Sequence, residues 1–200
     1  MREKIIVAGI DLAGSPNRNT GACIMHDRKV VLYATLFGDE EIIDFVRDSG
    51  AQVIAIDAPL SLPPGRKTLE ENNGVHLREC DKELIKRKIK FFPITIGPMR
   101  MLTKRGISLK KKFKRMGFES IEIFPGATQD VFGIPRKQHS MKGLLRGLEK
   151  LGIKGLNKEM NNDELDAVTG AYTGYLYLKG KAEVLGDLKK GAIIIPKRKL

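Results

Sequence analysis

Apolar residues form short runs, separated by polar or glycine-bearing breaks, along most of the 200-residue chain. Residues 6–10 and 52–56 are apolar at nearly every position, a pattern typical of strands that are covered on both faces. Residues 20–26 and 29–36 are strand-like runs separated by only two residues, which predicts a hairpin. Residues 118–124 alternate before a Pro-Gly pair and predict a further strand.

Apolar residues recur at helical spacing in the segments between these strands. The pattern predicts helices at residues 40–48, 76–90, 99–116 (broken near Gly106), 140–151 and 161–178. A helical crossover leads into the strand at 52–57, which we therefore expect to lie parallel to the first strand. Residues 191–196 predict a short edge strand or tail, and residues 197–200 a mobile end. These elements indicate an α/β fold with a mixed sheet, antiparallel over its first three strands and parallel afterwards, flanked by helices.

The composition of the chain indicates how many domains to expect and in which compartment the protein acts. A chain that is 42% hydrophobic and 30% charged fits one soluble domain spanning 1–200. No apolar run reaches the ~18 residues of a membrane helix, so we expect no membrane partner. The two cysteines form no CxxC motif, which favours a cytoplasmic location and gives no case for zinc. Few glutamines beside many charged residues hint at a thermophilic source. The pattern carries no sign of an oligomeric state.

Positive charge is concentrated in one segment. Of the net charge of +12, residues 78–115 supply +11, with fourteen Lys or Arg against three acids. This segment lies within residues 60–117, which interrupt the series of strands and are predicted as a basic helical insertion. Such segregation favours a surface that binds a polyanion, DNA or RNA, over a set of solvated helix faces. The candidate contacts are Arg78, Arg100, Lys104, Arg105, Lys110, Lys111 and Lys112.

Four aspartates occupy positions from which they can converge. Asp11 and Asp57 each end a buried strand, and parallel neighbours place both at the same rim of the sheet. Asp163 and Asp166 begin the last helix, and the same helix face continues with small residues that allow close approach to a sheet. The small residues are Ala167, Gly170 and Gly174. Taken alone, Asp163 equally suits the first turn of a helix, where an acid is favourable.

Carboxylates gathered in this way point to metal chemistry. They repel one another, and divalent cations remove the conflict. Ligands that are all oxygen favour Mg²⁺ or Mn²⁺, and a pair of such ions can hydrolyse a phosphodiester. No Ser-His-Asp or Cys-His arrangement and no Walker A sequence offers a rival chemistry.

Several stretches also carry a family resemblance. They are GIDLAG, IDAPLSLP, the R-x-C-D of residues 78–81, FFP, ESIEIFPGATQDVFGIPRKQ and NNDELDAVTGAYTGYL. With them the chain resembles, over most of its length, the DUF429 family of predicted nucleases on a ribonuclease H-like fold. The resemblance implies two bound Mg²⁺ or Mn²⁺ ions, with catalysis and metal ligation by Asp11, Asp57, Asp163 and Asp166.

Three other charged residues in these stretches have open roles. Glu122 lies on the strand after the insertion and is a further candidate metal ligand. Arg78 and Asp81 either line the site from the insertion or form an (i, i+3) helix pair.

The function expected from these features is a metal-dependent nuclease acting on DNA or RNA. One alternative is an actin-like ATPase or kinase, whose phosphate loop would use the G-x-D-x-x-G of Gly9, Asp11 and Gly14. Such proteins need a second domain, for which 200 residues leave no room. The other alternative is a catalytically inactive module that binds nucleic acid.

Overall fold

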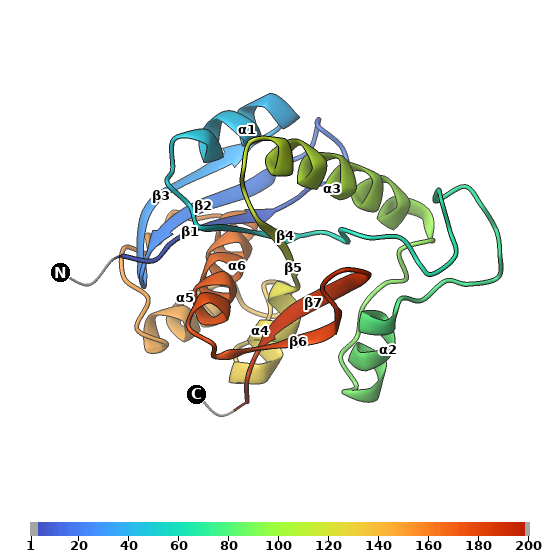
Figure 1. Ribbon diagram of the computed structural model, residues 1–200. Helices are drawn as coiled ribbons and strands as arrows, with labels where there is room; N and C mark the ends of the chain where they lie inside the picture. Colours follow the sequence, from blue (N-terminus) through green and yellow to red (C-terminus); the bar gives the residue numbers. More distant parts are fainter. Residues whose placement is uncertain (1–3, 199–200) are drawn as a thin grey trace.

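One mixed β-sheet runs through the computed structural model, which describes residues 4–198 (Figure 1). The strands are β1 (Ile6–Asp11), β2 (Thr20–His26), β3 (Lys29–Leu36), β4 (Val53–Asp57), β5 (Ser120–Ile123), β6 (Ala182–Asp187) and β7 (Gly191–Pro196). Their order across the sheet is β3-β2-β1-β4-β5-β7-β6. The β2 strand is antiparallel to both β1 and β3, whereas β4, β5 and β7 continue parallel to β1, and β6 is antiparallel to β7. The mixed sheet expected from the sequence is confirmed.

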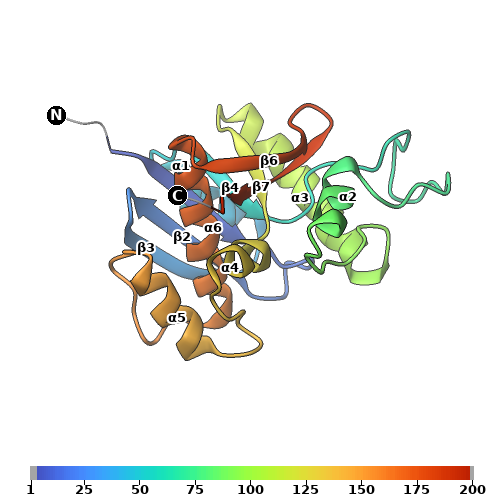
Figure 2. The same ribbon diagram turned by 90° about the horizontal axis from the view of Figure 1, so that it is seen from below.

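Helices cover both faces of the sheet. They are α1 (Asp39–Arg47), α2 (Glu79–Lys86), α3 (Gly97–Arg115), α4 (Pro125–Phe132), α5 (Met141–Lys150) and α6 (Asn162–Leu178). One core lies between the sheet and α5 and α6, and a second lies between the opposite face and α1 and α3. The two views show α4, α5 and α6 on one side and α1 and α3 on the other (Figures 1 and 2). Among residues 4–198, no helix is long and apolar enough to cross a membrane.

The helices of the basic segment differ from the expected pattern. The α2 helix is shorter than the predicted 76–90, and α3 is continuous where a break near Gly106 was expected. A Cβ on Gly106 would lie 2.9 Å from both the Ala58 Cβ and the Pro59 carbonyl oxygen. Gly106 therefore lets α3 pack closely on the loop after β4, and the helical hydrogen bonds continue through it.

The C-terminal part of the sheet also differs. The prediction of an edge strand or tail at 191–196 was wrong, because β7 pairs with β5 on one side and β6 on the other. The β6 strand, which forms the actual edge, and the short helix α4 were not anticipated. The segments that form β6 and α4 contain too few apolar residues to show a clear period. The predicted mobile end at 197–200 lies partly outside the described residues.

Close contact between α6 and the sheet determines the position of the helix. A Cβ on Gly9 of β1 would lie 2.1 Å from the Ala167 carbonyl oxygen, and one on Gly21 of β2 would lie 2.1 Å from the Asp163 carbonyl oxygen. On the helix, a Cβ on Gly174 would lie 2.7 Å from a Val7 methyl group. Backbone meets backbone at Gly9 and Gly21 because these two residues carry no side chain. The stripe of small residues has the packing role expected from the sequence.

We expect Gly9→Ala to destabilise the protein by about 3 kcal/mol, because the new methyl group forces α6 away from β1. Urea unfolding followed by circular dichroism measures the change. Gly38→Ala is the matched control, since its Cβ would meet nothing closer than 3.9 Å, and should cost less than about 1 kcal/mol. Equal losses in the two variants would contradict this account of the packing.

Candidate metal centre

Asp11 and Asp57 end two neighbouring parallel strands and lie directly opposite each other in the register. Their side chains point to the α6 face, because side chains alternate along a strand and both Gly9 and Ala55, two positions earlier, contact α6. The convergence of these two carboxylates, expected from the sequence, is therefore present in the structure.

The start of α6 is held against the strands by a capping box. Asn161 accepts hydrogen bonds from the backbone N–H groups of Asp163 and Glu164, both at 2.9 Å, and Glu164 accepts one from the Asn161 N–H. The Glu164 carboxylate also accepts from the Thr35 hydroxyl on β3, at 3.0 Å. These contacts direct Asp163 and Asp166 toward the ends of β1 and β4.

A lysine that sequence reasoning missed lies at the centre of the cluster. The Lys137 Nζ is 3.0 Å from Asp11 Oδ2, 2.9 Å from Asp163 Oδ1 and 3.0 Å from Asp166 Oδ2. Lys137 belongs to the connector between α4 and α5, more than 120 residues from Asp11 in the chain. The only sequence signal was its presence in the GATQDVFGIPRKQ stretch, which does not indicate where its side chain points.

A second missed residue is Gln129 on α4. Its Nε2 donates a 2.7 Å hydrogen bond to Asp166 Oδ1. Because Lys137 binds the other oxygen of Asp166, both carboxylate oxygens have a donor and the side chain is fixed in orientation.

The cluster carries more negative charge than Lys137 neutralises. Burial raises the pKa values of Asp11, Asp57 and Asp166, and carboxylate repulsion adds to the effect. Burial alone would lower the pKa of Lys137, but the carboxylates of Asp11 and Asp166 outweigh it and hold that pKa above its usual range. Asp57 has the least compensation, since no residue within 4–198 donates a hydrogen bond to its carboxylate.

The donor set fits a hard divalent cation. It consists of carboxylate oxygens alone, and its centre already accommodates a positive charge. As the side chains of residues 4–198 stand, no three acidic, histidine or cysteine side chains surround one point as ligands. Three of the carboxylates point instead at Lys137, which therefore competes with a divalent ion for the same oxygens.

An open cavity of about 470 Å³ gives access to this centre. It is lined by Asp11, Leu12, Ala13, Gly14, Arg18, Asn19, Lys137 and Asp163. Arg18 contributes a cation beside the carboxylates, a position suited to an anionic group of a substrate.

Glu122 is not part of the cluster. It points to the opposite face of the sheet from Ile121 and Ile123, which pack against the α6 side. There the Arg78 guanidinium donates to both oxygens of Glu122, at 2.7 and 2.8 Å, and also binds Asp81. The structure thus leaves Glu122 away from the candidate metal ligands, and Arg78 and Asp81 form the (i, i+3) pair.

Two of the arginines proposed to contact nucleic acid are buried. The exposed fraction is 3% for Arg78 and 8% for Arg105, and both are paired within the chain. Arg105 donates to Asp39 and to the Ala13 carbonyl oxygen, each at 2.8 Å, which ties α3 to the loop after β1. The structure therefore does not place these two residues on a binding surface.

The remaining basic candidates lie along α3 with different surroundings. Lys112 pairs with Asp39 and Glu40 of α1. Arg100 and Lys110 are half-buried, whereas Lys104 and Lys111 are exposed. Of the seven candidates from the sequence, Lys104 and Lys111 are therefore the most accessible to a partner.

The chain is similar in structure to Thermus thermophilus RuvC, with a TM-score of 0.50 and 10% sequence identity over 88% of this chain and 97% of RuvC. A second solved structure, T. thermophilus RuvC in complex with a Holliday junction substrate, gives a TM-score of 0.48 and 9% identity over the same shares. No protein-family model matches the chain, and no curated protein matches it. The first likeness shows a ribonuclease H-like fold, which confirms the fold class expected from the sequence.

In the presence of a chelator at pH 7.5, we expect Asp57→Asn to melt at a higher temperature than the wild type. The pKa of Asp57 is raised in the folded state, so its charge destabilises the fold. The penalty is absent below the unfolded-state pKa of ~4 and grows as the pH rises toward the folded-state pKa. Calorimetry at several pH values measures the difference, which should vanish at low pH.

Asp130→Asn is the control of opposite sign. Asp130 accepts two hydrogen bonds from Arg136 at a half-exposed position, so its loss should lower stability by at most about 1 kcal/mol. If Asp57→Asn melted lower than the wild type at pH 7.5, Asp57 would be a stabilising partner and not a member of a repulsive cluster.

Proposed function

We propose that this protein is a metal-dependent nuclease of the DUF429 type, which hydrolyses phosphodiester bonds of DNA or RNA. The observation that carries the proposal is the meeting of Asp11 and Asp57 with Asp163 and Asp166 at one rim of a ribonuclease H-like sheet. The family motifs in the sequence and the open cavity over the cluster support it.

The four aspartates would hold two Mg²⁺ or Mn²⁺ ions. When bound, such ions activate a water and stabilise the leaving oxygen of a phosphodiester. The chain itself positions the carboxylates: the capping box orients Asp163, and Gln129 orients Asp166. Lys137 keeps three carboxylates together before metal is bound, because its ammonium lowers their repulsion.

The position of Lys137 also favours a second candidate function. An ammonium group within 3.0 Å of three of the four carboxylates resembles a permanent counter-ion. In that case the protein would bind nucleic acid through its basic segment without cleaving it. The two functions make different predictions: a nuclease should bind a divalent metal and cleave its substrate in the presence of that metal, whereas a binding module should do neither.

For the nuclease, we expect cleavage of at least one member of a panel of single-stranded, duplex, branched and DNA–RNA hybrid substrates in Mn²⁺ or Mg²⁺. Asp11→Asn should reduce the rate by at least about a hundredfold, because it removes a ligand of the catalytic ions. Gel electrophoresis of end-labelled substrates measures the rates. Asp44→Asn, which changes an exposed carboxylate on α1, is the matched control.

Scanning calorimetry with and without Mn²⁺ gives a readout that does not depend on finding the substrate. Wild-type protein should gain about 2.7 kcal/mol of stability at a hundredfold excess over the dissociation constant, and Asp11→Asn much less. Cleavage that persists in excess chelator, or in Asp11→Asn, would exclude this mechanism. If the wild-type protein neither bound Mn²⁺ nor cleaved any substrate, the nuclease function would be excluded and the nucleic-acid-binding module would be the remaining candidate.

Nucleic-acid affinity should depend steeply on salt, because the basic segment releases counter-ions from the phosphates. Replacing Lys104 and Lys111 by Glu should lower the slope of log affinity against log salt by about 1 to 2. Fluorescence anisotropy over a salt series measures the slope. The control reverses the exposed Lys142 and Lys150 on α5, an equal change in net charge, and an equal loss of slope there would show that no particular surface is involved.

A further inference from the structure

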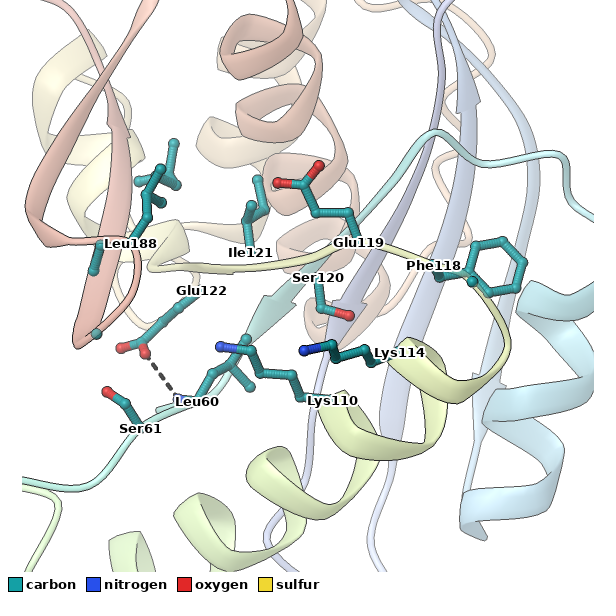
Figure 3. Close-up of a pocket in the computed structure, with 14 residues that line it drawn as sticks. Leu60, Ser61, Lys110, Lys114, Phe118, Glu119, Ser120, Ile121, Glu122 and Leu188 are labelled. Atoms are coloured by element: carbon teal, nitrogen blue, oxygen red, sulfur yellow. Dashed lines mark hydrogen bonds between the residues drawn. The ribbon is translucent and has the colours of Figure 1, made fainter. Parts of the chain in front are cut away.

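A second cavity, of about 420 Å³, lies on the sheet face opposite the aspartate cluster. It is bordered by α3, by β5 and by the turn between β6 and β7 (Figure 3). Ser120 and Glu122 of β5 face this cavity, while the Glu119 side chain points to the other side of the strand, as Figure 3 shows. The cavity is therefore separate from the candidate metal centre.

Two lysines reach across this cavity from α3. Lys110 and Lys114 are one helical turn apart and both extend toward β5, on the side of Ser120 (Figure 3). Within residues 4–198 neither forms an ion pair, in contrast to Lys112 on the same helix, which pairs with carboxylates of α1. The ammonium groups of Lys110 and Lys114 therefore both face this cavity without an ion-pair partner among the described residues.

A buried hydroxyl without a partner lies in the same wall. The Ser120 Oγ is inaccessible to solvent and forms no hydrogen bond among the described residues. Because a buried polar group without a partner costs free energy, such a group calls for an explanation. The Ser61 hydroxyl also lines the cavity, and it accepts a hydrogen bond from Arg78 at 3.2 Å, which leaves its own proton free to donate.

Glu122, a carboxylate in the wall of the cavity, does not pair with the two lysines. Glu122 accepts from Arg78 with both oxygens and from the Leu60 N–H, at distances of 2.7 to 2.8 Å. Arg78 also binds Asp81, so these three groups together carry one negative charge. With Lys110 and Lys114, and with Glu119, whose carboxylate points to the other side of β5, the charges around the cavity sum to zero, but among the described residues neither ammonium group has an ion-pair partner.

We propose that this cavity binds a phosphate monoester that is attached to an apolar or aromatic body. A phosphate monoester carries −1.5 to −2 charges near neutral pH and accepts several hydrogen bonds, which matches two ammonium groups and the Ser61 hydroxyl. The buried Ser120 hydroxyl would join them once its side chain turns toward the ligand. Leu60, Leu188 and Ala192 supply an apolar wall for the attached group. The volume lies in the range of small-molecule sites. Nucleoside monophosphates and the phosphorylated 5′ end of a strand share this chemistry.

Calorimetric titration in the presence of a chelator tests the proposal without the metal centre. Adenosine monophosphate should bind with 1:1 stoichiometry, and adenosine at least about tenfold more weakly, because the phosphate provides the charged contacts. The double variant Lys110→Gln/Lys114→Gln should lose at least about tenfold in affinity. Lys142→Gln/Arg146→Gln, an exposed pair with the same spacing on α5 and outside the cavity, is the matched control and should bind as the wild type does.

Ser120→Ala gives a second readout. It should weaken nucleotide binding without lowering the melting temperature, because it removes a buried hydroxyl that has no partner in the free protein. Absence of saturable binding to the wild type, or equal losses in the two double variants, would overturn the proposal. Asp11→Asn should bind the nucleotide normally, so failure of the nuclease proposal would not affect this result.

The source of the phosphate is decided by comparing the mononucleotide with 5′-phosphorylated and 5′-hydroxyl forms of one oligonucleotide. A strand that binds more tightly with its 5′ phosphate, through Lys110 and Lys114, identifies the end of a nucleic acid as the ligand. Tight binding of the mononucleotide, with no effect of the 5′ phosphate on strand binding, identifies a free nucleotide.

Discussion

The close contact between α6 and the sheet is the constraint on which the candidate metal centre depends. Ala167 and Asp163 place their carbonyl oxygens where Gly9 and Gly21 have no side chain. At this separation the first turn of α6 lies directly beside the ends of β1 and β4. Asp166 can therefore approach the carboxylates of Asp11 and Asp57, which larger residues at the glycine positions would prevent.

Bringing these carboxylates together has an electrostatic cost that the fold compensates only in part. Lys137 lies within 3.0 Å of three of them, and Gln129 binds the remaining oxygen of Asp166. Asp57 has no such partner within residues 4–198, and its pKa is raised. Incomplete compensation is typical of functional sites, where groups are arranged for a ligand at the expense of stability.

Part of the charge in the basic segment between β4 and β5 serves an internal, structural role. The buried ion pairs of Arg78 attach α2 to β5, and Arg105 attaches α3 to α1 through its ion pair with Asp39 and to the loop after β1 through its hydrogen bond to the Ala13 carbonyl oxygen. Removing one partner of such a buried pair leaves the other uncompensated and typically costs 3–5 kcal/mol. Charge in this segment thus divides into residues that hold it to the rest of the fold and residues that are exposed, such as Lys104 and Lys111.

Local pattern was enough to determine the elements that carry the aspartates. The apolar runs before Asp11 and Asp57, the two-residue hairpin turn and the cap at Asn161 are all short-range features, and the structure contains each of them. Parallel pairing of β1 with β4 follows from the crossover rule. The sequence by itself therefore indicated which four carboxylates meet and that small residues on α6 allow it.

Only the tertiary structure decided which charges pair. Lys137, Arg78 and Arg105 are similar in sequence context to exposed basic residues, and their partners lie 126, 44 and 66 positions away. The face to which Glu122 points and the internal position of β7 likewise depend on register and strand order. Such choices follow from long-range packing and from the cost of burying an unpaired charge, neither of which leaves a periodic signal in the sequence.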